Sequence, residues 1–308
     1  MNLPELHITS IKRPLSGWPW TEETDADIYA IYNSWPKISI ITPSYNQGNY
    51  LEQTIRSVLC QNYPNLEYIL IDGKSSDQSV DIIRRYSQCL HFWVSEPDAG
   101  QSDALNKGFA RATGEILAWI NSDDYYEKDA FFKVAFQYKK TGFTFLCGRC
   151  QMIDQEGQLI QELHTKKISY NTLIRYWKPH FCPPQPSVFF KRTSLEELGN
   201  FNPDLKYAMD YDIWLRASKK YSFRTINENI SYYRVHLNSK TGSVGGLAKF
   251  IPEWKMLINK SLNHESVYTK WKYRLHENWF RIINRVSSLF QKHELKKIAR
   301  QWFIRNQM

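Results

Sequence analysis

The chain has 308 residues, of which 42% are hydrophobic and 15% aromatic, and its formal net charge is +9. This composition excludes a mainly disordered protein, because it supplies enough apolar side chains to build a core. Ten Lys or Arg residues against two Glu give residues 270–308 a charge of +8, which leaves only +1 for the rest of the chain and argues against a folded nucleic-acid-binding face.

Residues 1–35 mix Pro, Trp and acidic residues without a sustained period, which predicts an N-terminal extension laid over the fold. From residue 36 onward, short β-rich runs alternate with helical ones. The alternation predicts an α/β fold, a single Rossmann-like domain whose sheet is mixed but mostly parallel. The expected strands are 38–41, 68–71, 91–94 and 115–120, and the expected helices are 50–61, 79–88 and 101–111.

The pattern weakens in residues 126–245, which form the second half of the predicted domain. Strands are expected at 143–153, 158–163, 187–191 and 223–235, and helices near residue 128 and at 170–177 and 210–218. A C-terminal helical tail is expected in residues 246–308. Within it, residues 270–308 place apolar side chains on one face and cations on the other, which suits docking on the domain and peripheral contact with an anionic membrane equally well.

Cysteine usage and the first residues predict a cytoplasmic protein. The five cysteines are an odd number, and no charged segment followed by an apolar one opens the chain, so neither a disulfide framework nor secretion is expected. The longest apolar stretches, such as residues 116–120, are far shorter than the roughly 20 residues that cross a bilayer. Any membrane contact is therefore expected to be peripheral, on the inner face of the cell membrane.

Polar residues follow the predicted parallel strands at their carboxyl ends, where open α/β sheets bind ligands. Ser44, Asp72, Glu96 and Asp123 all fall there. Asp123 and Asp124 follow an apolar strand directly, and carboxylate oxygens suit Mg²⁺ or Mn²⁺ bridged to a phosphate. Two acids at a strand end are equally typical of a turn or a helix cap, so the pair alone does not identify a metal site.

Five segments, in this order and at this spacing, resemble the family 2 glycosyltransferases, while the GxGxxG and Walker A loops of other nucleotide-binding folds are absent. The segments are PKISIITPSYN at 36–46, IDGKSSD at 71–77, SEPDAG at 95–100, NKG at 106–108 with ATGE at 112–115, and NSDD at 121–124. The resemblance covers about residues 37–240. It implies a nucleotide-sugar-binding domain of the glycosyltransferase A type, with a donor half (36–125) and an acceptor half (126–245), that transfers a sugar with inversion.

The resemblance also implies how the donor is held. It places Thr42 and Pro43 beside the nucleoside and makes Asp72 the carboxylate that hydrogen-bonds the base. Because a carboxylate accepts from an imide N–H, uracil or thymine is favoured, and with it a UDP- or dTDP-sugar. Three further residues are expected near the donor: Glu96, Asp98 and Gly100, whose missing side chain lets the backbone approach the ligand.

Charged groups are expected to hold the diphosphate. Lys107 is a candidate point charge for the phosphates, with a solvated helical lysine as the alternative. Asp124 is expected to be the stronger ligand of Mn²⁺ or Mg²⁺. Asp123 is expected as a second ligand or as a contact to the donor sugar or ribose.

An inverting transferase needs a general base for the acceptor hydroxyl. The segment YAMDYDIWLR at 207–216 resembles the family's acidic motif, in which Asp210 matches the base, although Met209 stands where a Glu commonly precedes it. A helix N-terminus is expected to lower the pKa of Asp210 and keep it ionised. Asp212 is the rival base, and two residues i and i+2 on a helix point in different directions, so only one of the two is expected to face the site.

Two further groups complete the expected site, and a cysteine pair is expected outside it. Residues 232–243 resemble the segment that closes over the diphosphate, with His236 as a candidate metal ligand, Arg234 as a phosphate contact, and lid-like mobility expected. Gln185 lies in a Pro-rich segment on the acceptor side and is a candidate sugar contact. Cys147 and Cys150 have CxxC spacing, but no second pair completes a zinc site, so buried free thiols are expected.

The sequence therefore predicts a metal-dependent inverting glycosyltransferase that uses a nucleotide sugar and a saccharide or lipid-linked acceptor, in cell-surface polysaccharide or glycan synthesis. Two alternatives remain open at this stage. A sugar nucleotidyltransferase also uses a parallel sheet and metal-binding acids, although residues 42–46 lack its Gly-rich basic loop. A non-catalytic membrane or nucleic-acid binding protein would rely on the basic residues 270–308.

Overall fold

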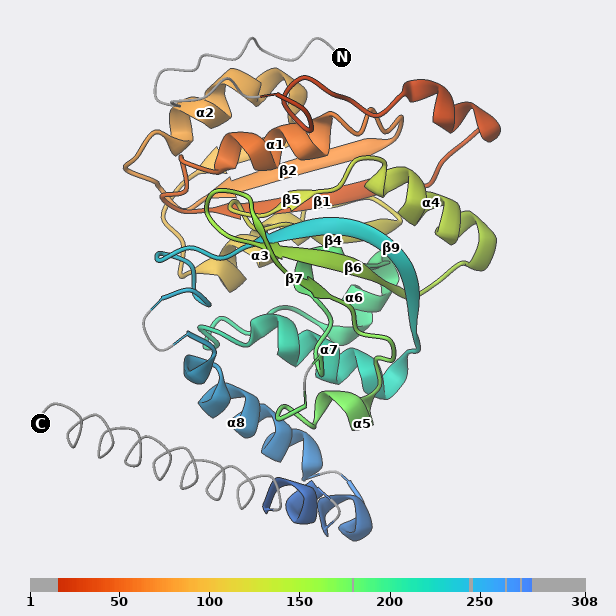
Figure 1. Ribbon diagram of the computed structural model, residues 1–308, viewed down its shortest axis with the longest axis vertical. Helices are drawn as coiled ribbons and strands as arrows, with labels where there is room; N and C mark the ends of the chain where they lie inside the picture. The colour runs from red at the N-terminus through yellow and green to blue at the C-terminus, as the bar shows by residue number, and fades with distance from the viewer. Residues whose placement is uncertain (1–15, 179, 244–245, 264, 272, 279–308) are drawn as a thin grey trace, which may run out of the picture.

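The computed structural model describes residues 16–178, 180–243, 246–263, 265–271 and 273–278, and these residues form one sheet covered by helices on both faces (Figure 1). The strands lie in the order β3-β2-β1-β4-β8-β6-β9-β5, and β7 pairs with β6. Their bounds are β1 (Ile38–Ser44), β2 (Leu66–Asp72), β3 (Phe92–Ser95), β4 (Ile116–Trp119), β5 (Tyr125–Tyr126), β6 (Phe145–Ile153), β7 (Leu159–Leu163), β8 (Val188–Lys191) and β9 (Phe223–Arg234).

The sheet is mixed, as predicted, and its first half is parallel. β1 pairs in parallel with β2 and with β4, and β2 pairs in parallel with β3. β8 runs antiparallel between β4 and β6, whereas β6 and β9 are parallel. The carboxyl ends of β1 to β4 therefore meet at one end of the sheet, which is where a ligand of an α/β fold is expected to bind.

Helices cover both faces of the sheet (Figure 1). α1, α2 and α4 pack on one face, and α3 and α7 pack on the other. The helices are α1 (Leu51–Leu59), α2 (Ser79–Tyr86), α3 (Gln101–Phe109), α4 (Ala130–Thr141), α5 (Tyr170–Leu173), α6 (Arg192–Leu198), α7 (Met209–Lys220) and α8 (Ile251–Leu262). Short 3₁₀ segments lie at Ala26–Ile31, Ser87–Cys89, Gln185–Ser187 and Gly246–Lys249.

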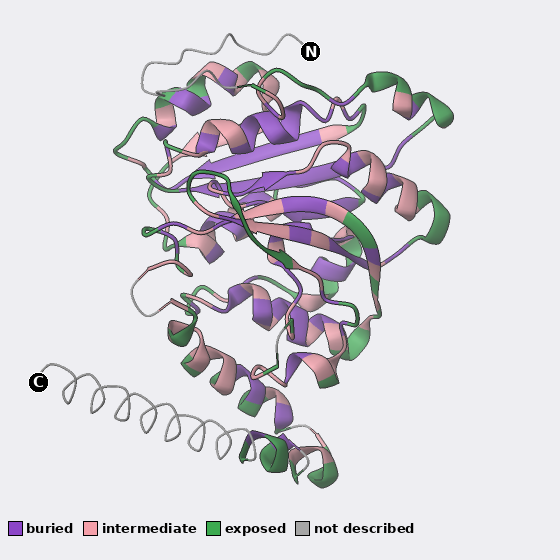
Figure 2. Ribbon diagram, in the orientation of Figure 1, coloured by how far each residue is buried: buried purple, intermediate pink, exposed green. Residues whose placement is uncertain are grey.

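Alternate side chains of the central strands enter two separate cores, which explains why these strands are continuous apolar runs. Ile40 and Ala118 pack toward α1, whereas Ile41 and Trp119 pack toward α3 and α7. Figure 2 shows buried residues along the strands and on the inward sides of the helices. The indole of Trp119 stacks on Trp214 of α7 with ring centroids 5.5 Å apart, so this core fixes α7 directly under the site.

Residues 16–35 lie over the face of the sheet that α1, α2 and α4 cover. Tyr29 and Trp35 are buried in its core, and the indole N–H of Trp18 donates to the carbonyl of Tyr126. The Arg56 guanidinium donates to the carbonyls of Pro19 and Trp20. Aromatic burial and these backbone contacts hold the segment against α1.

Each strand and helix predicted for residues 38–235 is present, with ends that differ by a few residues. β5 and α6 were not predicted, because they are short or have weak periodicity, whereas α8 lies within the C-terminal helical region predicted at 246–308. Residues 267–271 and 273–278 are helical, and the remainder of the predicted amphipathic stretch, residues 279–308, lies outside the described residues. In the part of the chain that the structure describes, no helix is both long and apolar enough to cross a membrane.

Glu67 of β2 is a fully buried carboxylate at the end of the sheet opposite the expected site. Lys37 Nζ lies 2.7 Å from it, Thr113 donates a backbone N–H at 2.7 Å, and the Ser39 hydroxyl also donates. Burial alone raises the pKa of Glu67, but these hydrogen bonds outweigh burial and lower it to about 2. The ionised form is therefore favoured in the folded state.

We expect Glu67→Gln to lower the free energy of unfolding at pH 7 by about 3 kcal/mol. Because the folded-state pKa lies below the unfolded value of 4.5, this stabilisation is present above pH 4.5 and is lost as the pH falls toward 2. Denaturant unfolding at several pH values measures it. Glu196→Gln, at an exposed ion pair with Arg192, is the control. A constant difference between wild type and Glu67→Gln from pH 7 to pH 3 would contradict the prediction.

Candidate active site

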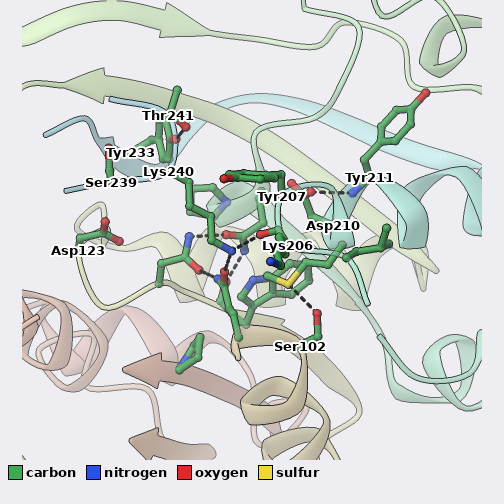
Figure 3. Close-up of a pocket in the computed structure, with 18 of the residues that line it drawn as sticks. Ser102, Asp123, Lys206, Tyr207, Asp210, Tyr211, Tyr233, Ser239, Lys240 and Thr241 are labelled. Atoms are coloured by element: carbon green, nitrogen blue, oxygen red, sulfur yellow. Dashed lines mark hydrogen bonds between the residues drawn. The ribbon is translucent and has the colours of Figure 1, made fainter. Parts of the chain in front are cut away.

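A cavity of about 1300 Å³ opens at the carboxyl ends of β1 and β4 and extends to α7 and α8 (Figure 3). Both halves of the predicted domain contribute to its wall, and so does the C-terminal helical region. The residues that line the cavity include Pro43, Asp98, Gly100, Gln101, Asn121, Asp123, Phe181, Gln185, Lys206, Tyr207, Asp210, Lys240, Phe250 and Trp254. The structure thus brings together segments that are more than a hundred residues apart.

Asp123, which follows β4, contacts His236, which follows β9. Asp123 lines the cavity, and its Oδ2 lies 3.0 Å from His236 Nε2. His236 is buried behind it, with its ring 4.7 Å from that of Tyr50, and does not itself line the cavity. In the described residues, no group of three or more His, Cys, Asp or Glu side chains is arranged to hold a metal ion.

Asp124 occupies a different environment from its neighbour. Its carboxylate is buried and does not line the cavity. It accepts from the backbone N–H of Arg234 at 2.9 Å and from Asn121 Nδ2 at 3.1 Å. Burial and the nearby Asp123 carboxylate raise the pKa of Asp124 well above its usual value. The ranking of Asp124 above Asp123 as a metal ligand therefore does not fit this geometry, because the turn after β4 directs Asp124 inward.

The Arg234 guanidinium is engaged by protein groups and does not line the cavity. It lies over the rings of Tyr50 and Tyr125, at 5.0 and 5.6 Å from their centroids. It donates to Gln53 Oε1 and to the carbonyls of Asp123, Asp154 and Gln155. Arg234 thus joins β9 to the turn that carries Asp123, and the structure does not present it to a phosphate as the sequence predicted.

Asp210 lies in the first turn of α7 and lines the cavity. Burial raises its pKa to about 6, against the opposing effects of the Tyr211 backbone N–H and the Lys240 ammonium. The sequence-based expectation of a lowered pKa was wrong in direction, because burial outweighs the helix N-terminus. At pH 7 the carboxylate is still mainly ionised, with a higher proton affinity than an exposed Asp.

Asp212 points away from the cavity, as expected for the second acid of the same turn. Its Oδ2 accepts from Nε and Nη2 of Arg216, at 3.0 and 2.9 Å. Arg216 in turn donates to backbone carbonyls of residues 198–200 at the end of α6. Asp212 therefore holds α6 against α7, and Asp210 is left as the acid of this turn that faces the cavity.

The predicted nucleoside contacts divide into two groups. Pro43 lines the cavity, whereas Thr42 is buried and its hydroxyl lies 3.1 Å from that of Tyr68. Asp72 is buried as well: its Oδ2 accepts from the Ser75 backbone N–H at 2.9 Å and the Ser95 hydroxyl at 2.7 Å, and its Oδ1 accepts from the Ser75 hydroxyl at 2.5 Å. Its contact with the base stays a prediction, since the protein already occupies both of its oxygens.

The loop between β3 and α3 presents its backbone to the cavity. Gly100 has φ +107°, a conformation that L side chains rarely adopt, and a Cβ built there would meet nothing within 4 Å. Asp98 lines the cavity next to it and accepts from the Gly100 N–H at 2.9 Å. Glu96 and Lys107 lie outside the cavity and bind each other at 3.0 Å. The structure therefore retains Asp98 and Gly100 in the site and leaves Glu96 and Lys107 beside it.

The amide side chains of Gln101, Asn121 and Gln185 line the cavity and bind one another. Gln185 donates from Nε2 to the Trp119 carbonyl at 2.8 Å and accepts from Asn121 at 3.2 Å. Asn121 accepts from Gln101 Nε2 at 2.6 Å. These contacts fix the Gln185 side chain at the cavity wall, where the sequence placed it on the acceptor side.

Cys147 and Cys150 are buried free thiols, as expected.

Several lining residues were not predicted from the sequence. Lys240 follows β9 and lies between Asp123 and Asp210 in Figure 3. Phe250 and Trp254 come from the C-terminal helical region, where only a weak amphipathic pattern marks α8. Trp254 packs against Phe181, with ring centroids 5.0 Å apart. The basic loop at 232–243 was recognised as part of the site, but nothing in its sequence singles out Lys240.

Comparison with known proteins agrees with the resemblance seen in the sequence. The family described as "Glycosyl transferase family 2" matches residues 39–199, which is just over half of the chain. TuaG from Bacillus subtilis, a glycosyltransferase provisionally assigned to teichuronic acid biosynthesis, is 30% identical over 221 residues, covering 70% of this chain and 85% of TuaG. The aligned parts span 65% and 76% of the lengths of two further glycosyltransferase relatives.

Two solved structures share the fold. TarS 1–349 from S. aureus in complex with UDP-GlcNAc superposes with a TM-score of 0.60 and 20% identity, covering 75% of this chain and 68% of that one. The mannosyltransferase PcManGT from Pyrobaculum calidifontis in complex with GDP-Man and Mn²⁺ superposes with a TM-score of 0.51 and 20% identity, covering 83% and 74%. Their likeness confirms the predicted α/β fold of the glycosyltransferase A type. With the family match, it establishes that the chain belongs to glycosyl transferase family 2.

Proposed function

We propose that this protein transfers a sugar from a nucleoside-diphosphate sugar to a saccharide or lipid-linked acceptor, with inversion, in the synthesis of a cell-surface polysaccharide. One observation carries the proposal: a single cavity has Asp123 on its donor wall and Asp210 on its opposite wall, with Lys240 between them (Figure 3). The family supplies the reaction class, and the cavity supplies a place for both substrates. Because the chain belongs to glycosyl transferase family 2, we do not propose a sugar nucleotidyltransferase activity for Asp123 and Asp124.

Asp123 and His236 suit a divalent cation that is shared with the donor. Asp123 Oδ2 and His236 Nε2 lie 3.0 Å apart. These two side chains would hold Mn²⁺ or Mg²⁺, and a carboxylate oxygen is a ligand that both ions prefer. Bound there, Mn²⁺ or Mg²⁺ would neutralise negative charge on the departing diphosphate.

The nucleotide is proposed to lie along the ends of β1 and β2. Pro43, Asp98 and the open face of Gly100 line this part of the cavity. The complexes of TarS with UDP-GlcNAc and of PcManGT with GDP-Man support a nucleotide-sugar donor, and the proposed uracil or thymine base rests on Asp72 at the end of β2 as its partner. Lys240 also lines the cavity, where its ammonium donates to Gln101 Oε1 and to the Lys206 carbonyl, each at 2.7 Å.

Asp210 is proposed as the general base. It accepts the proton of the acceptor hydroxyl while the acceptor oxygen forms a bond to the anomeric carbon and the bond between that carbon and the diphosphate oxygen breaks. Because attack comes from the face opposite the diphosphate, the configuration inverts. A pKa of about 6 matches this task, since the carboxylate is ionised at pH 7 and still binds a proton in the transition state.

The acceptor is proposed to occupy the part of the cavity lined by Gln185, Phe181, Phe250 and Trp254. Aromatic faces and an amide suit a sugar ring, which has an apolar face and polar edges. A lipid-linked acceptor would also agree with the proposed peripheral contact of residues 270–308 with the inner face of the membrane. Sedimentation with anionic liposomes at low and high salt tests that contact.

A panel of nucleotide sugars tests the proposed function. We expect at least one UDP- or dTDP-sugar to bind with a dissociation constant of about 1 μM to 1 mM when Mn²⁺ or Mg²⁺ is present, and to be hydrolysed slowly without an acceptor. Chelation of the metal should lower the affinity by about tenfold or more. Isothermal calorimetry and detection of released nucleoside diphosphate give both quantities. Absence of binding by every nucleotide sugar with either metal would contradict the proposal.

A further inference from the structure

Residues 206–208 form the turn that leads into α7 and lie just ahead of Asp210. The cap residue Ala208 has no side chain that can accept from the free N–H groups of the helix start. Glu253 of α8 supplies the acceptor instead. Its carboxylate accepts from the backbone N–H groups of Lys206, Tyr207 and Ala208, at 3.0, 2.9 and 2.7 Å. One side chain from the C-terminal helical region thus fixes three consecutive peptide groups beside the proposed base.

Lys240 binds the same turn through a backbone carbonyl. Its ammonium donates to the Lys206 carbonyl at 2.7 Å and to Gln101 Oε1 at 2.7 Å. Gln101 begins α3 in the donor half and donates in turn to Asn121, two residues before Asp123. Figure 3 shows Lys240 reaching across the cavity between Asp123 and the turn at Lys206 and Tyr207. Lys240 therefore joins the donor wall to the turn that carries Asp210.

The two residues that hold the turn have opposite charges, and both act on Asp210. The Lys240 ammonium stabilises the ionised form of Asp210, whereas the Glu253 carboxylate opposes it. Cys182 and Tyr233 also interact with Asp210, and burial raises the pKa of each. At neutral pH these two groups are uncharged, so of these four side chains it is Lys240 and Glu253 that act on Asp210 through charge.

We propose that Glu253 and Lys240 are positioning residues that hold the turn 206–208, and with it Asp210, at the distance and orientation that attack requires. Because Lys240 binds both Gln101 and the turn, the position of Asp210 depends on the donor wall. This inference rests on the proposed role of Asp210. Both residues lie beyond residues 39–199, which match the family, so the positioning device belongs to the second half of this chain.

Two substitutions with matched controls test the proposal. Glu253→Gln leaves an amide that cannot accept from all three N–H groups, and Lys240→Met removes the ammonium but keeps the length of the side chain. Glu265→Gln is the control for Glu253, because Glu265 pairs with Lys219 of α7 at 2.8 Å without touching the turn. Lys249→Met is the control for Lys240, because Lys249 donates to Ser243 at 2.9 Å, away from Asp210.

We expect kcat for transfer to fall about 10- to 100-fold in both variants, with the donor KM within about threefold of wild type, because a displaced base costs rate rather than donor affinity. Lys240→Arg should restore most of kcat. The acid limb of the pH–kcat profile should move to higher pH in Lys240→Met and to lower pH in Glu253→Gln. A role limited to folding would not move the limb in opposite directions.

Hydrogen exchange of residues 206–208 gives a readout that does not need activity. Exchange should be faster in Glu253→Gln than in Glu265→Gln. If transfer depends on Asp210 but both variants keep wild-type kcat and pH profile, the positioning role is overturned and the proposed function stands. If wild type binds no nucleotide sugar, the proposed function fails. If residues 206–208 exchange at the same rate in Glu253→Gln and in Glu265→Gln, the contact of Glu253 with the turn is overturned as well. If Glu253→Gln does not fold, the kcat and the pH–kcat profile of Lys240→Met test the positioning role.

Discussion

Asp210→Asn is expected to lower kcat for sugar transfer by about a thousandfold while leaving donor affinity nearly unchanged. Asparagine keeps the size of the side chain and its hydrogen bond from Tyr211 but cannot take up the acceptor proton. General-base catalysis typically contributes about 10² to 10⁴ in rate. Initial rates with saturating donor, together with donor affinity from calorimetry, separate the chemical step from binding.

The pH dependence of wild-type kcat gives a second measure of the same residue. The base must be ionised, and its pKa is raised to about 6 by burial. Below pH 6 the rate should therefore fall about tenfold for each pH unit, and it should level off above pH 7. Because the raised pKa means that ionised Asp210 destabilises the folded state at neutral pH, Asp210→Asn should also raise the melting temperature.

Asp212→Asn is the control for this prediction. It makes the same chemical change two residues along α7, at a carboxylate that binds Arg216 and does not face the cavity. We expect it to weaken the contact between α6 and α7 and to change kcat by less than about threefold. If Asp212→Asn were inactive and Asp210→Asn active, the assignment of the base would be reversed.

Asp123→Asn is expected to remove metal-dependent donor binding, whereas Asp124→Asn should mainly lower stability. The Asp123 carboxylate lines the cavity beside His236. A divalent ion would provide several kcal/mol of stabilisation to the departing diphosphate, so loss of the proposed carboxylate ligand should reduce activity about a hundredfold or more. Titration of Mn²⁺ in the presence of the nucleoside diphosphate measures the lost affinity.

Asp124→Asn places an amide N–H₂ group where the carboxylate now accepts from Arg234 and Asn121. An unsatisfied buried donor typically costs about 1 to 3 kcal/mol, which denaturant unfolding can measure. Metal affinity per folded molecule should remain close to wild type. If Asp124→Asn bound no metal while fully folded, and Asp123→Asn bound it normally, the order predicted from the sequence would be restored.

Local pattern was sufficient to predict most of the secondary structure. Continuous apolar runs identify β1, β2 and β4, because strands that are buried on both faces have no polar side. The two-residue strand β5 has no pattern of its own and exists because β9 pairs with it. α8 was not predicted as a separate helix, because its place is set by contacts of Trp254 and Glu253 with distant segments.

The order of the strands and the packing of α7 bring Pro43, Asp98, Asp123 and Asp210 to one cavity, and their roles stay predictions. The orientation of individual side chains could not be predicted in the same way. Arg234 lies at the end of β9, and pairing with β6 places its guanidinium over Tyr50 and Tyr125. No pattern in residues 232–243 reveals those two rings.

The sequence by itself determined the fold class, the family resemblance and the end of the sheet at which the candidate site lies, because apolar periodicity and the order of short motifs are local properties of the chain. Only the tertiary structure decided that Asp123 and not Asp124 faces the cavity, and that Asp210 has a raised pKa. Only the tertiary structure joined Lys240 and Glu253 to the turn beside Asp210. Burial, side-chain direction and long-range hydrogen bonds depend on segments that meet only when the chain is folded.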